Sequence, residues 1–595
     1  MRKIKFISLL ITLLFTGNIL FAQTADDGKK FIYYERYNSA KDILGKLVNA
    51  NPNNVDAAYW LGQAYLGTED SISAKALYQK TLSANPNAPL MLVGMGQIAL
   101  MDGQKDEARN RFETAISLTK GKDYNVINAI GRASVDARAG DAVYAIEKLK
   151  TIPENKRTAE MWATLGDAYR KMIDGANAQL SYQGALTADP NYARASFMIG
   201  RIYQTQGFSQ EQYYMKYYNE AISKDSKFAP VYYWLYDYYY QRDVNKSRGY
   251  LDQYIAVADA DSKNCYYQAS VLYAGKQYQQ AITKSNECIA TGGQTAYLKL
   301  YGLKAFAYDK IADIVNNRVD SYKKAGDSVT AGKALDTVKQ NYTSAKQFFE
   351  QYFQKQKPEN LLSGDYATYG KVLLKFPGNE VTAATYIDKA IALDTLEANK
   401  IEFITSVANN YIAAKNYNEA AKWYARIFAI KKNVTKTDIY NAGYNYYKAG
   451  NYRTADSVFV MYQQKYPDDI IGFYLGALSL AYIDSTGALG LAKPDYEKVI
   501  LLAQASADTA RSKPQLITSY NYMVAYYYKK NDYATAISYV EKILALDPTN
   551  AQALENRKAL LSATKVKTKG DETKIKTPTT KEKITPGKVK VKGNK

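Results

Sequence analysis

The side chains that most often carry out acid–base and metal chemistry are scarce in this sequence. It contains no histidine, so the commonest general base and a main metal ligand are both missing. Its two cysteines are Cys265 and Cys288, which excludes any multi-cysteine zinc or iron–sulfur site. No nucleophile–base pair or metal cluster can be assembled from the other residues. The sequence therefore predicts a protein that is not an enzyme and that uses no cofactor or metal.

One short motif has the letters of a dinucleotide-binding loop, Gly94-x-Gly96-x-x-Ala99. That motif needs a strand before it, so that a phosphate group meets the N-terminus of the following helix. Here Gly96 falls inside a helical pattern. We therefore interpret these residues as structural.

Tyrosine is the abundant side chain that can bind a partner, with 57 copies in the chain. Its ring buries a large area at low entropic cost and keeps a polar tip. Tyrosine also stacks on sugar rings. The composition thus favours binding over catalysis, and the elements that present the rings decide where binding can occur.

The stretch from Trp162 to Pro190 shows those elements most clearly. Three large residues are spaced as on one face of a helix: Trp162, Leu165 and Tyr169. Three more residues line one face of a second helix: Ala178, Tyr182 and Ala185. Asp189-Pro190 ends that helix, because the residue before proline is pushed out of helical geometry. The stretch predicts two helices packed through small residues.

Two glycines near the middle of this stretch add detail. Gly is unfavourable inside a helix, so Gly166 indicates that another backbone passes close to the first helix. Ile173-Asp174-Gly175 ends the first helix and permits a tight turn.

This pattern resembles the tetratricopeptide repeat, a helix–turn–helix unit of about 34 residues. The resemblance extends over roughly residues 31–560 and is strong in three units, which begin near Trp162, Gly443 and Tyr520. It implies an all-α fold, an α-solenoid in which about 12–13 repeats form a right-handed superhelix. First helices of the repeats would line the concave side.

The chain divides into five predicted segments. They are a signal peptide at 1–22, an N-terminal array at 23–310, a helical insertion at 311–344, a C-terminal array with a capping helix at 345–562, and a disordered lysine-rich tail at 563–595. The insertion breaks the repeat period and has a polar middle around Lys323 to Ser328. Its sequence does not indicate what it does.

The first residues predict export. A basic start is followed by an apolar run from Phe6 to Phe21, and Ala22-Gln23 is a plausible cleavage site. A retained membrane anchor is the alternative, although the run is shorter than the roughly 20 residues that span a bilayer. We expect a periplasmic or envelope-associated protein.

In repeat register, Cys265 and Cys288 fall near the start of one helix and near the end of its antiparallel partner. A disulfide between them is reasonable in an oxidising compartment, and two separate buried cysteines are the alternative. A redox-catalytic pair is disfavoured, because there is no C-x-x-C to lower a thiol pKa.

The same register places a second group of tyrosines on the concave face, together with one acid. These candidate binding residues are Tyr233, Asp237, Tyr240, Tyr440, Tyr444 and Tyr447. A purely compositional abundance of tyrosine is the alternative. The predicted function is a non-enzymatic scaffold that holds a protein or peptide partner in the groove. The rival hypothesis is a glycan or envelope polysaccharide on the same surface.

Charge adds one further expectation. The formal net charge is +20, and residues 563–595 hold eleven lysines against three acids. This tail could make peripheral contact with anionic envelope components. Export and the lack of aromatics among its lysines argue against a nucleic-acid partner.

Overall fold

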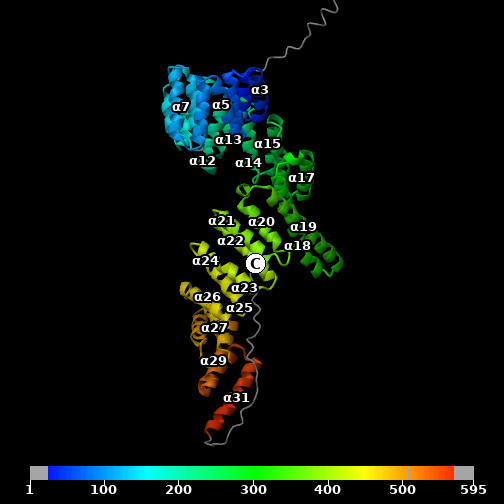
Figure 1. Ribbon diagram of the computed structural model, residues 1–595. Coiled ribbons are helices and arrows are strands. Elements are labelled where there is room, and N and C mark those ends of the chain that lie inside the picture. Colours follow the sequence, from blue (N-terminus) through cyan, green and yellow to red (C-terminus); the bar gives the residue numbers. More distant parts are fainter. Residues whose placement is uncertain (1–23, 138, 507–509, 569–595) are drawn as a thin grey trace, which may run out of the picture. The chain divides into compact units, whose positions relative to one another are not determined.

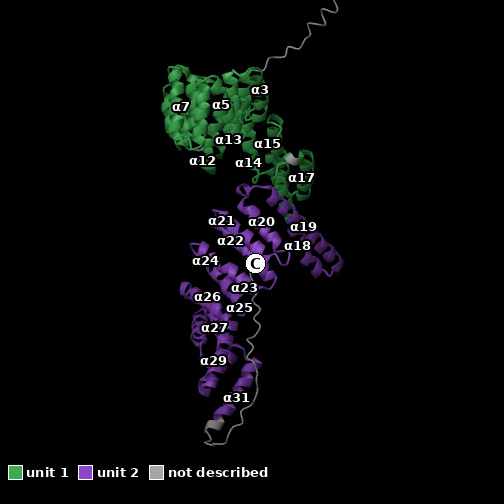
Figure 2. Cartoon of the chain, in the orientation of Figure 1, with its two compact units in different colours: residues 1–310 green, residues 311–595 purple. Residues whose placement is uncertain are grey.

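The computed structural model describes residues 24–137, 139–506 and 510–568, and this part of the chain is built from helices (Figure 1). It forms two compact units, unit 1 (Met1–Lys310) and unit 2 (Ile311–Lys595), shown in Figure 2. The predicted signal peptide and most of the predicted tail lie outside the described residues.

The helices of unit 1 follow one another in antiparallel pairs. They are α2 (Ala25–Tyr33), α3 (Tyr37–Ala50), α4 (Val55–Gly67), α5 (Ser71–Ala84), α6 (Pro89–Met101), α7 (Lys105–Leu118), α8 (Tyr124–Asp136), α9 (Ala142–Lys150), η1 (Glu154–Lys156), α10 (Ala159–Lys171), α11 (Gly175–Ala188), α12 (Ala193–Thr205), η2 (Phe208–Gln210), α13 (Glu211–Lys224), α14 (Ala229–Tyr239), α15 (Val244–Val257), α16 (Ser262–Ala274), α17 (Tyr278–Gly292) and η3 (Gly293–Thr295).

Unit 2 continues the series, and α18 starts before its first residue. The helices are α18 (Lys299–Lys324), α19 (Ser328–Lys355), η4 (Pro358–Asn360), α20 (Ser363–Leu373), α21 (Glu380–Leu393), α22 (Glu397–Ala413), α23 (Tyr417–Ala425), α24 (Ile427–Ile430), α25 (Lys436–Lys448), α26 (Tyr452–Lys465), α27 (Ile470–Ile483), α28 (Lys493–Ala505), α29 (Lys513–Lys529), α30 (Tyr533–Leu546) and α31 (Ala551–Thr568).

Consecutive helices pack against each other in both units, first within a pair and then onto the next pair. The described residues contain no strand. The predicted all-α fold, an α-solenoid, is therefore confirmed.

Within a pair, a glycine of the first helix lies under a large side chain of the second. A Cβ atom on Gly166 would come 2.7 Å from Cε1 of Tyr182, whose ring is fully buried. The prediction that Gly166 accommodates another backbone is corrected in this detail, because the ring of Tyr182 fills the space. The same arrangement recurs at Gly62–Tyr78, Gly96–Phe112, Gly131–Leu149, Gly200–Tyr218, Gly370–Ile387 and Gly443–Phe459.

The turn inside several pairs contains one residue in the left-handed region. In the pair α10–α11 this residue is Ile173, with φ of 61°, whereas Gly175 begins the next helix with ordinary geometry. The segment Ile173-Asp174-Gly175 therefore separates the two helices as expected, with Ile173 in the left-handed position of the turn. Asp174 then caps α11 by accepting a hydrogen bond from Asn177 N at 3.1 Å. Glycine occupies the left-handed position in other pairs, as Gly103 and Gly450 do.

The predicted insertion takes a specific form. Residues 311–343 prolong both helices of one pair, so that α18 and α19 form a long hairpin that turns at Gly326. Within unit 2 the hairpin packs through Ala312, Val338 and Tyr342. Tyr342 Oη donates a 2.6 Å hydrogen bond to Asp313 Oδ1.

One predicted boundary differs from the structure. The pair α2–α3 lies within the array predicted at 23–310, ahead of the first repeat that the sequence pattern reveals. At the other end, α31 runs to Thr568 and not to Ser562, so residues 563–568 are helical and do not begin a disordered tail.

Candidate functional site

Three of the predicted binding residues form a stack on one face of α25. The ring centroids of Tyr440 and Tyr444 are 5.3 Å apart with nearly parallel planes, and those of Tyr444 and Tyr447 are 6.4 Å apart. Their spacing of four and three residues places the rings one above another along the helix. Tyr447 then meets Tyr482 at 5.9 Å, and Tyr482 stacks on Tyr452 at 4.4 Å. We call these five residues the tyrosine ladder.

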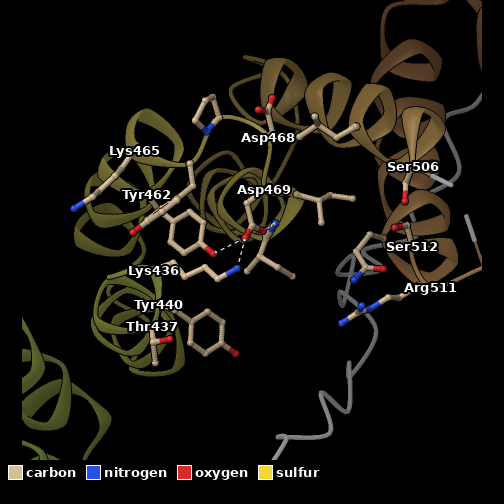
Figure 3. Close-up of a pocket in the computed structure, with 16 residues that line it drawn as sticks. Lys436, Thr437, Tyr440, Tyr462, Lys465, Asp468, Asp469, Ser506, Arg511 and Ser512 are labelled. Carbon is tan, nitrogen blue, oxygen red and sulfur yellow. Dashed lines mark hydrogen bonds and ion pairs between the residues drawn. The ribbon is translucent and has the colours of Figure 1, made fainter. Parts of the chain in front are cut away.

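A pocket of about 920 Å³ adjoins the Tyr440 end of the ladder. Figure 3 shows Tyr440 and Tyr462 on one side of it and Ser512 and Arg511 on the other. Its wall combines aromatic and aliphatic side chains with charges of both signs. Such a mixture binds ligands by contact area while a few polar groups fix orientation.

Asp469 is the best-anchored charge in this pocket. Its carboxylate accepts hydrogen bonds from Tyr462 Oη at 3.0 Å and from Ile471 N at 3.0 Å, which caps the start of α27. Lys436 Nζ lies 3.5 Å away. Burial, and then the charge of Asp469, raise the pKa of Tyr462. Asp469 therefore holds the pocket wall together, whereas the neighbouring Asp468 is exposed.

The other predicted residues lie along α14 in unit 1, from Tyr233 inside the helix to Tyr240 at its C-cap. Tyr233 packs against Tyr254 and Tyr267 at ring distances of 5.3 and 5.4 Å. Tyr240 donates a 3.0 Å hydrogen bond to the carbonyl of Ser270, and Asp237 is exposed. Tyr233 and Tyr240 both join a cluster around buried Leu251. Like the rings of the ladder, Tyr233 and Tyr240 are half-buried and pack against a buried core.

The pair α2–α3, which the repeat pattern does not reveal, binds to the far end of its own unit. Asp259, in the loop before α16, accepts hydrogen bonds from Asn38 N at 2.7 Å, Ser39 N at 3.2 Å and Ser39 Oγ at 2.5 Å. Helix α3 has no capping side chain of its own, so Asp259 caps it from across the unit. Arg36 Nε adds an ion pair with Asp259 at 3.4 Å.

Two tyrosines before this cap extend the contact. Tyr34 Oη donates a 2.8 Å hydrogen bond to Asp225, and Tyr33 Oη accepts one of 3.2 Å from Arg194 N. The Tyr33 ring also packs at 5.2 Å from the ring of Phe228. The run Tyr33-Tyr34-Glu35-Arg36-Tyr37 is a visible sequence signal, but the partners lie about 200 residues away and no repeat register links them.

Behind this contact lies a cavity of about 580 Å³ with a charged wall. Its lining comes from first helices of the pairs, with the α2–α3 turn. Arg132 pairs with Glu160 and Arg194 with Asp167, both at 2.8 Å. The Arg201 guanidinium lies 3.5 Å from the Trp234 ring centre, and burial lowers its pKa. The two ion pairs tie neighbouring repeats together across the cavity.

Cys265 of α16 and Cys288 of α17 are joined by a disulfide, with their Cα atoms 5.9 Å apart. The bridge packs among Ala269, Leu300 and Leu303. It therefore fastens the two helices of one pair inside unit 1.

In the described ranges, no three His, Cys, Asp or Glu side chains come together where they could hold a metal ion. Nor does any helix there combine the length and apolarity needed to cross a bilayer.

Two segments of the chain match a known repeat family. The tetratricopeptide repeat family model matches residues 55–88 and 519–550, which are α4–α5 and most of α29–α30. Tetratricopeptide repeat protein 6 of Homo sapiens is 30% identical over 193 residues, 32% of this chain and 36% of the human protein. The match thus spans about a third of that relative's length.

Among solved structures, the C-terminal part of a TPR repeat-containing protein from Cytophaga hutchinsonii is 26% identical, covering 49% of this chain and 98% of that one, with a TM-score of 0.31. Yeast Tom70 is 13% identical, covering 75% and 96%, with a TM-score of 0.31. Both scores are low, so the assignment depends on the family match and the packing. The family match identifies tetratricopeptide repeats at residues 55–88 and 519–550, and the packing of a glycine under a large side chain repeats the same helix pair between them.

Proposed function

We propose that this protein is an exported, non-enzymatic scaffold of the periplasm or cell envelope that holds a protein or peptide partner on the tyrosine ladder of unit 2. Tetratricopeptide repeat arrays serve as protein-interaction scaffolds, which supports the general role. The observation that carries the choice of surface is the stack of half-buried Tyr440, Tyr444 and Tyr447 beside a pocket of about 920 Å³.

The chemistry of the ladder suits a polypeptide. Tyrosine is enriched where proteins bind each other, because each ring contributes area with few rotamers to immobilise. Lys436 and Asp468 at the pocket rim supply charges of both signs for backbone and side-chain contacts. Tyr233 and Tyr240 of unit 1 pack in the cluster around Leu251 and, within the described ranges, line no pocket of this size. We rank the ladder above that group because Tyr440 lines the pocket of about 920 Å³.

Two features support export. The apolar run before Gln23 is typical of a signal peptide, although it lies outside the described residues. A disulfide such as Cys265–Cys288 persists in oxidising compartments. The lysine-rich tail would then lie close to anionic envelope components, with which it can make peripheral contact.

The test is capture of partners from envelope extract by the mature chain and by the double variant Tyr440→Ala, Tyr444→Ala. The control is Tyr528→Ala, another tyrosine of unit 2 that is 52% exposed and lies outside the ladder. We expect the wild-type chain and the control to retain the same protein, and the double variant to lose it with an unchanged melting temperature.

Two outcomes would contradict the proposal. If the double variant unfolds, these rings belong to the core and do not form a binding face. If the chain retains purified envelope polysaccharide and no protein, the glycan alternative replaces the protein partner, since stacked tyrosines beside carboxylates also suit sugar rings.

A further inference from the structure

A second cavity of unit 1, of about 520 Å³, has a wall that combines tyrosines with charged side chains. It lies between the start of α3, the end of α4 and the helices α14 to α16. Five tyrosines line it: Tyr34, Tyr37, Tyr233, Tyr254 and Tyr267. Its volume is in the range of small-molecule sites.

Three of these rings form one connected group. Tyr233 lies 5.3 Å from Tyr254 and 5.4 Å from Tyr267, and Tyr254 lies 6.5 Å from Tyr267, with planes inclined by 55–64°. They come from three successive helices, α14, α15 and α16. The face of an aromatic ring carries negative electrostatic potential, so rings that line one cavity favour a positive ligand.

The charged residues of the cavity wall also favour a positively charged ligand. Four acids line it, Glu35, Glu69, Asp259 and Asp261, against two lysines, Lys41 and Lys263. The ammonium of Lys41 is bonded to Thr68 Oγ1 at 3.3 Å.

The acids are not equally available. Asp259 is used in capping α3, and Asp261 caps α16 through Lys263 N at 2.8 Å. Glu35 is exposed at the α2–α3 turn; burial around its carboxyl raises its pKa, and the charges of Arg194 and Arg201 in the neighbouring cavity oppose that rise. Burial, with added repulsion from Glu35, Asp261 and Asp259, raises the pKa of Tyr254 to about 12. The field at the rings is thus negative.

We propose that this cavity binds an organic cation, an alkylammonium or guanidinium group, against the faces of Tyr233, Tyr254 and Tyr267. Glu35 supplies the opposite charge, and the capping carboxylates of Asp259 and Asp261 add to the negative wall. The group can belong to a free small molecule or to a lysine or arginine side chain of a polypeptide. This site lies in unit 1 and is independent of the ladder of unit 2.

The test is calorimetric titration of the mature full-length chain with choline and with 3,3-dimethyl-1-butanol, its neutral isostere. Because the isostere keeps the shape and loses the charge, we expect it to bind at least about tenfold more weakly than choline. A third probe, the peptide Gly-Gly-Arg-Gly-Gly with a glutamine version as control, distinguishes the two sources. Tighter binding of the arginine peptide than of choline assigns the site to a polypeptide.

Variants place the binding at this cavity. Tyr254→Leu should weaken choline binding about five- to tenfold, and Tyr254→Phe, which keeps the ring, should restore most of it. Glu35→Gln changes an exposed side chain and should cost about threefold, even if Tyr254→Leu proves unstable. The control Tyr213→Leu alters a tyrosine of unit 1 that is 45% exposed and outside the cavity, and should change nothing.

The proposal is overturned if neither choline nor the arginine peptide saturates at concentrations on the order of 10 mM. Equal binding of choline and its neutral isostere would also overturn it. The double ladder variant Tyr440→Ala, Tyr444→Ala should bind choline as the wild type does, so failure of either proposal leaves the other standing.

Discussion

Units 1 and 2 are built from the same helix pair but differ in how far their contacts reach. In unit 1, Arg36 meets Asp259 across 223 residues of sequence, and Tyr34 meets Asp225 across 191. In unit 2, the side-chain hydrogen bonds join nearby pairs, such as Lys530 to Ala488 across 42 residues and Arg426 to Asp388 across 38. Unit 1 therefore closes on its own first pair, whereas unit 2 follows the nearest-neighbour pattern of repeat arrays.

This difference bears on how each unit binds. Closing a long loop costs entropy that the junction must offset, and in unit 1 a few side chains around Asp259 do so. Unit 1 contains two cavities with charged or aromatic walls. Unit 2 presents stacked rings beside a wider pocket. The same repeat thus yields cavities between distant pairs in unit 1 and a stack of half-buried rings beside a pocket in unit 2.

The substitution with the largest expected effect tests whether loss of a core side chain in unit 2 destabilises that unit alone. Phe459 is fully buried against Gly443, so Phe459→Ala should lower the free energy of unfolding by about 3–5 kcal/mol. Urea denaturation followed by hydrogen exchange should show unit 2 opening earlier while unit 1 keeps its protection.

The matched control is Val460→Ala, the next residue of α26, which is 39% exposed and should change the free energy of unfolding by less than about 1 kcal/mol. Equal loss of protection in both units after Phe459→Ala would remove the contrast between them.

The second prediction breaks the junction of unit 1. Asp259→Ala removes the cap of α3 and the partner of Arg36, and should destabilise the α2–α3 pair by about 1–2 kcal/mol. Hydrogen exchange should rise in α2 and α3 with little change in α10 and α11. The control Asp252→Ala removes an exposed carboxylate of the neighbouring α15. If the two variants behave alike, Asp259 does not hold the unit closed.

The third prediction concerns how the stability of unit 2 depends on pH. Asp495 accepts a 2.9 Å hydrogen bond from Gln463, yet burial, aided by nearby Asp456, raises its pKa to about 6 from 3.8. The folded state therefore takes up a proton between pH 7 and 5 that the unfolded chain does not, so unit 2 becomes more stable as the pH falls through this window.

Asp495→Asn should abolish that slope and stabilise unit 2 at pH 7.5 by roughly 1 kcal/mol, a figure reduced because the site is partly solvated. Thermal melts from pH 5 to pH 8 measure it. Asp468→Asn, at an exposed carboxylate, should leave the slope intact. A slope that persists in Asp495→Asn would assign the titration to another group.

The smallest expected effect comes from a substitution that gives a turn of unit 1 the glycine found at the same turn position in unit 2. Ile173 has φ of 61° and is 93% exposed, whereas glycine holds the same turn position at Gly450 of unit 2. Ile173→Gly should raise the free energy of unfolding by about 0.5–1 kcal/mol, because a β-branched residue is strained there. In the control, Ile72→Gly within helix α5, the same substitution should destabilise. If both substitutions lower the free energy of unfolding, the backbone at Ile173 is not strained.

Much of the fold was predictable from local pattern. The spacing of Trp162, Leu165 and Tyr169 marks one helix, and the small residues Ala178 and Ala185 mark the face on which the second packs. The packing at the glycines was predictable only in part. The sequence indicated that Gly166 leaves space for a neighbouring group, but it did not show that the ring of Tyr182 fills that space. The long hairpin shows in the sequence as a break in the period, because its added turns shift the register without changing helical propensity.

The candidate sites were predictable in part. The tyrosine spacing on α25 predicts that Tyr440, Tyr444 and Tyr447 share one face, and the structure shows them stacked. Whether a partner binds there stays a prediction. Tyr233 and Tyr240 are spaced along α14 as regularly as the tyrosines of α25. The ring neighbours of Tyr233, however, are Tyr254 and Tyr267 of other helices, and only the packing of these helices creates the cavity.

The sequence by itself determined the helix pair, its repetition and therefore the solenoid, because these depend on residues within about 34 positions of each other. The tertiary structure alone decided that Asp259 caps α3, that Asp225 meets Tyr34, and which side chains share a cavity. The physical reason is that small changes in packing angle accumulate over many repeats. Whether two distant helix pairs come into contact depends on the sum of these angle changes, and the sequence of a single repeat does not determine that sum.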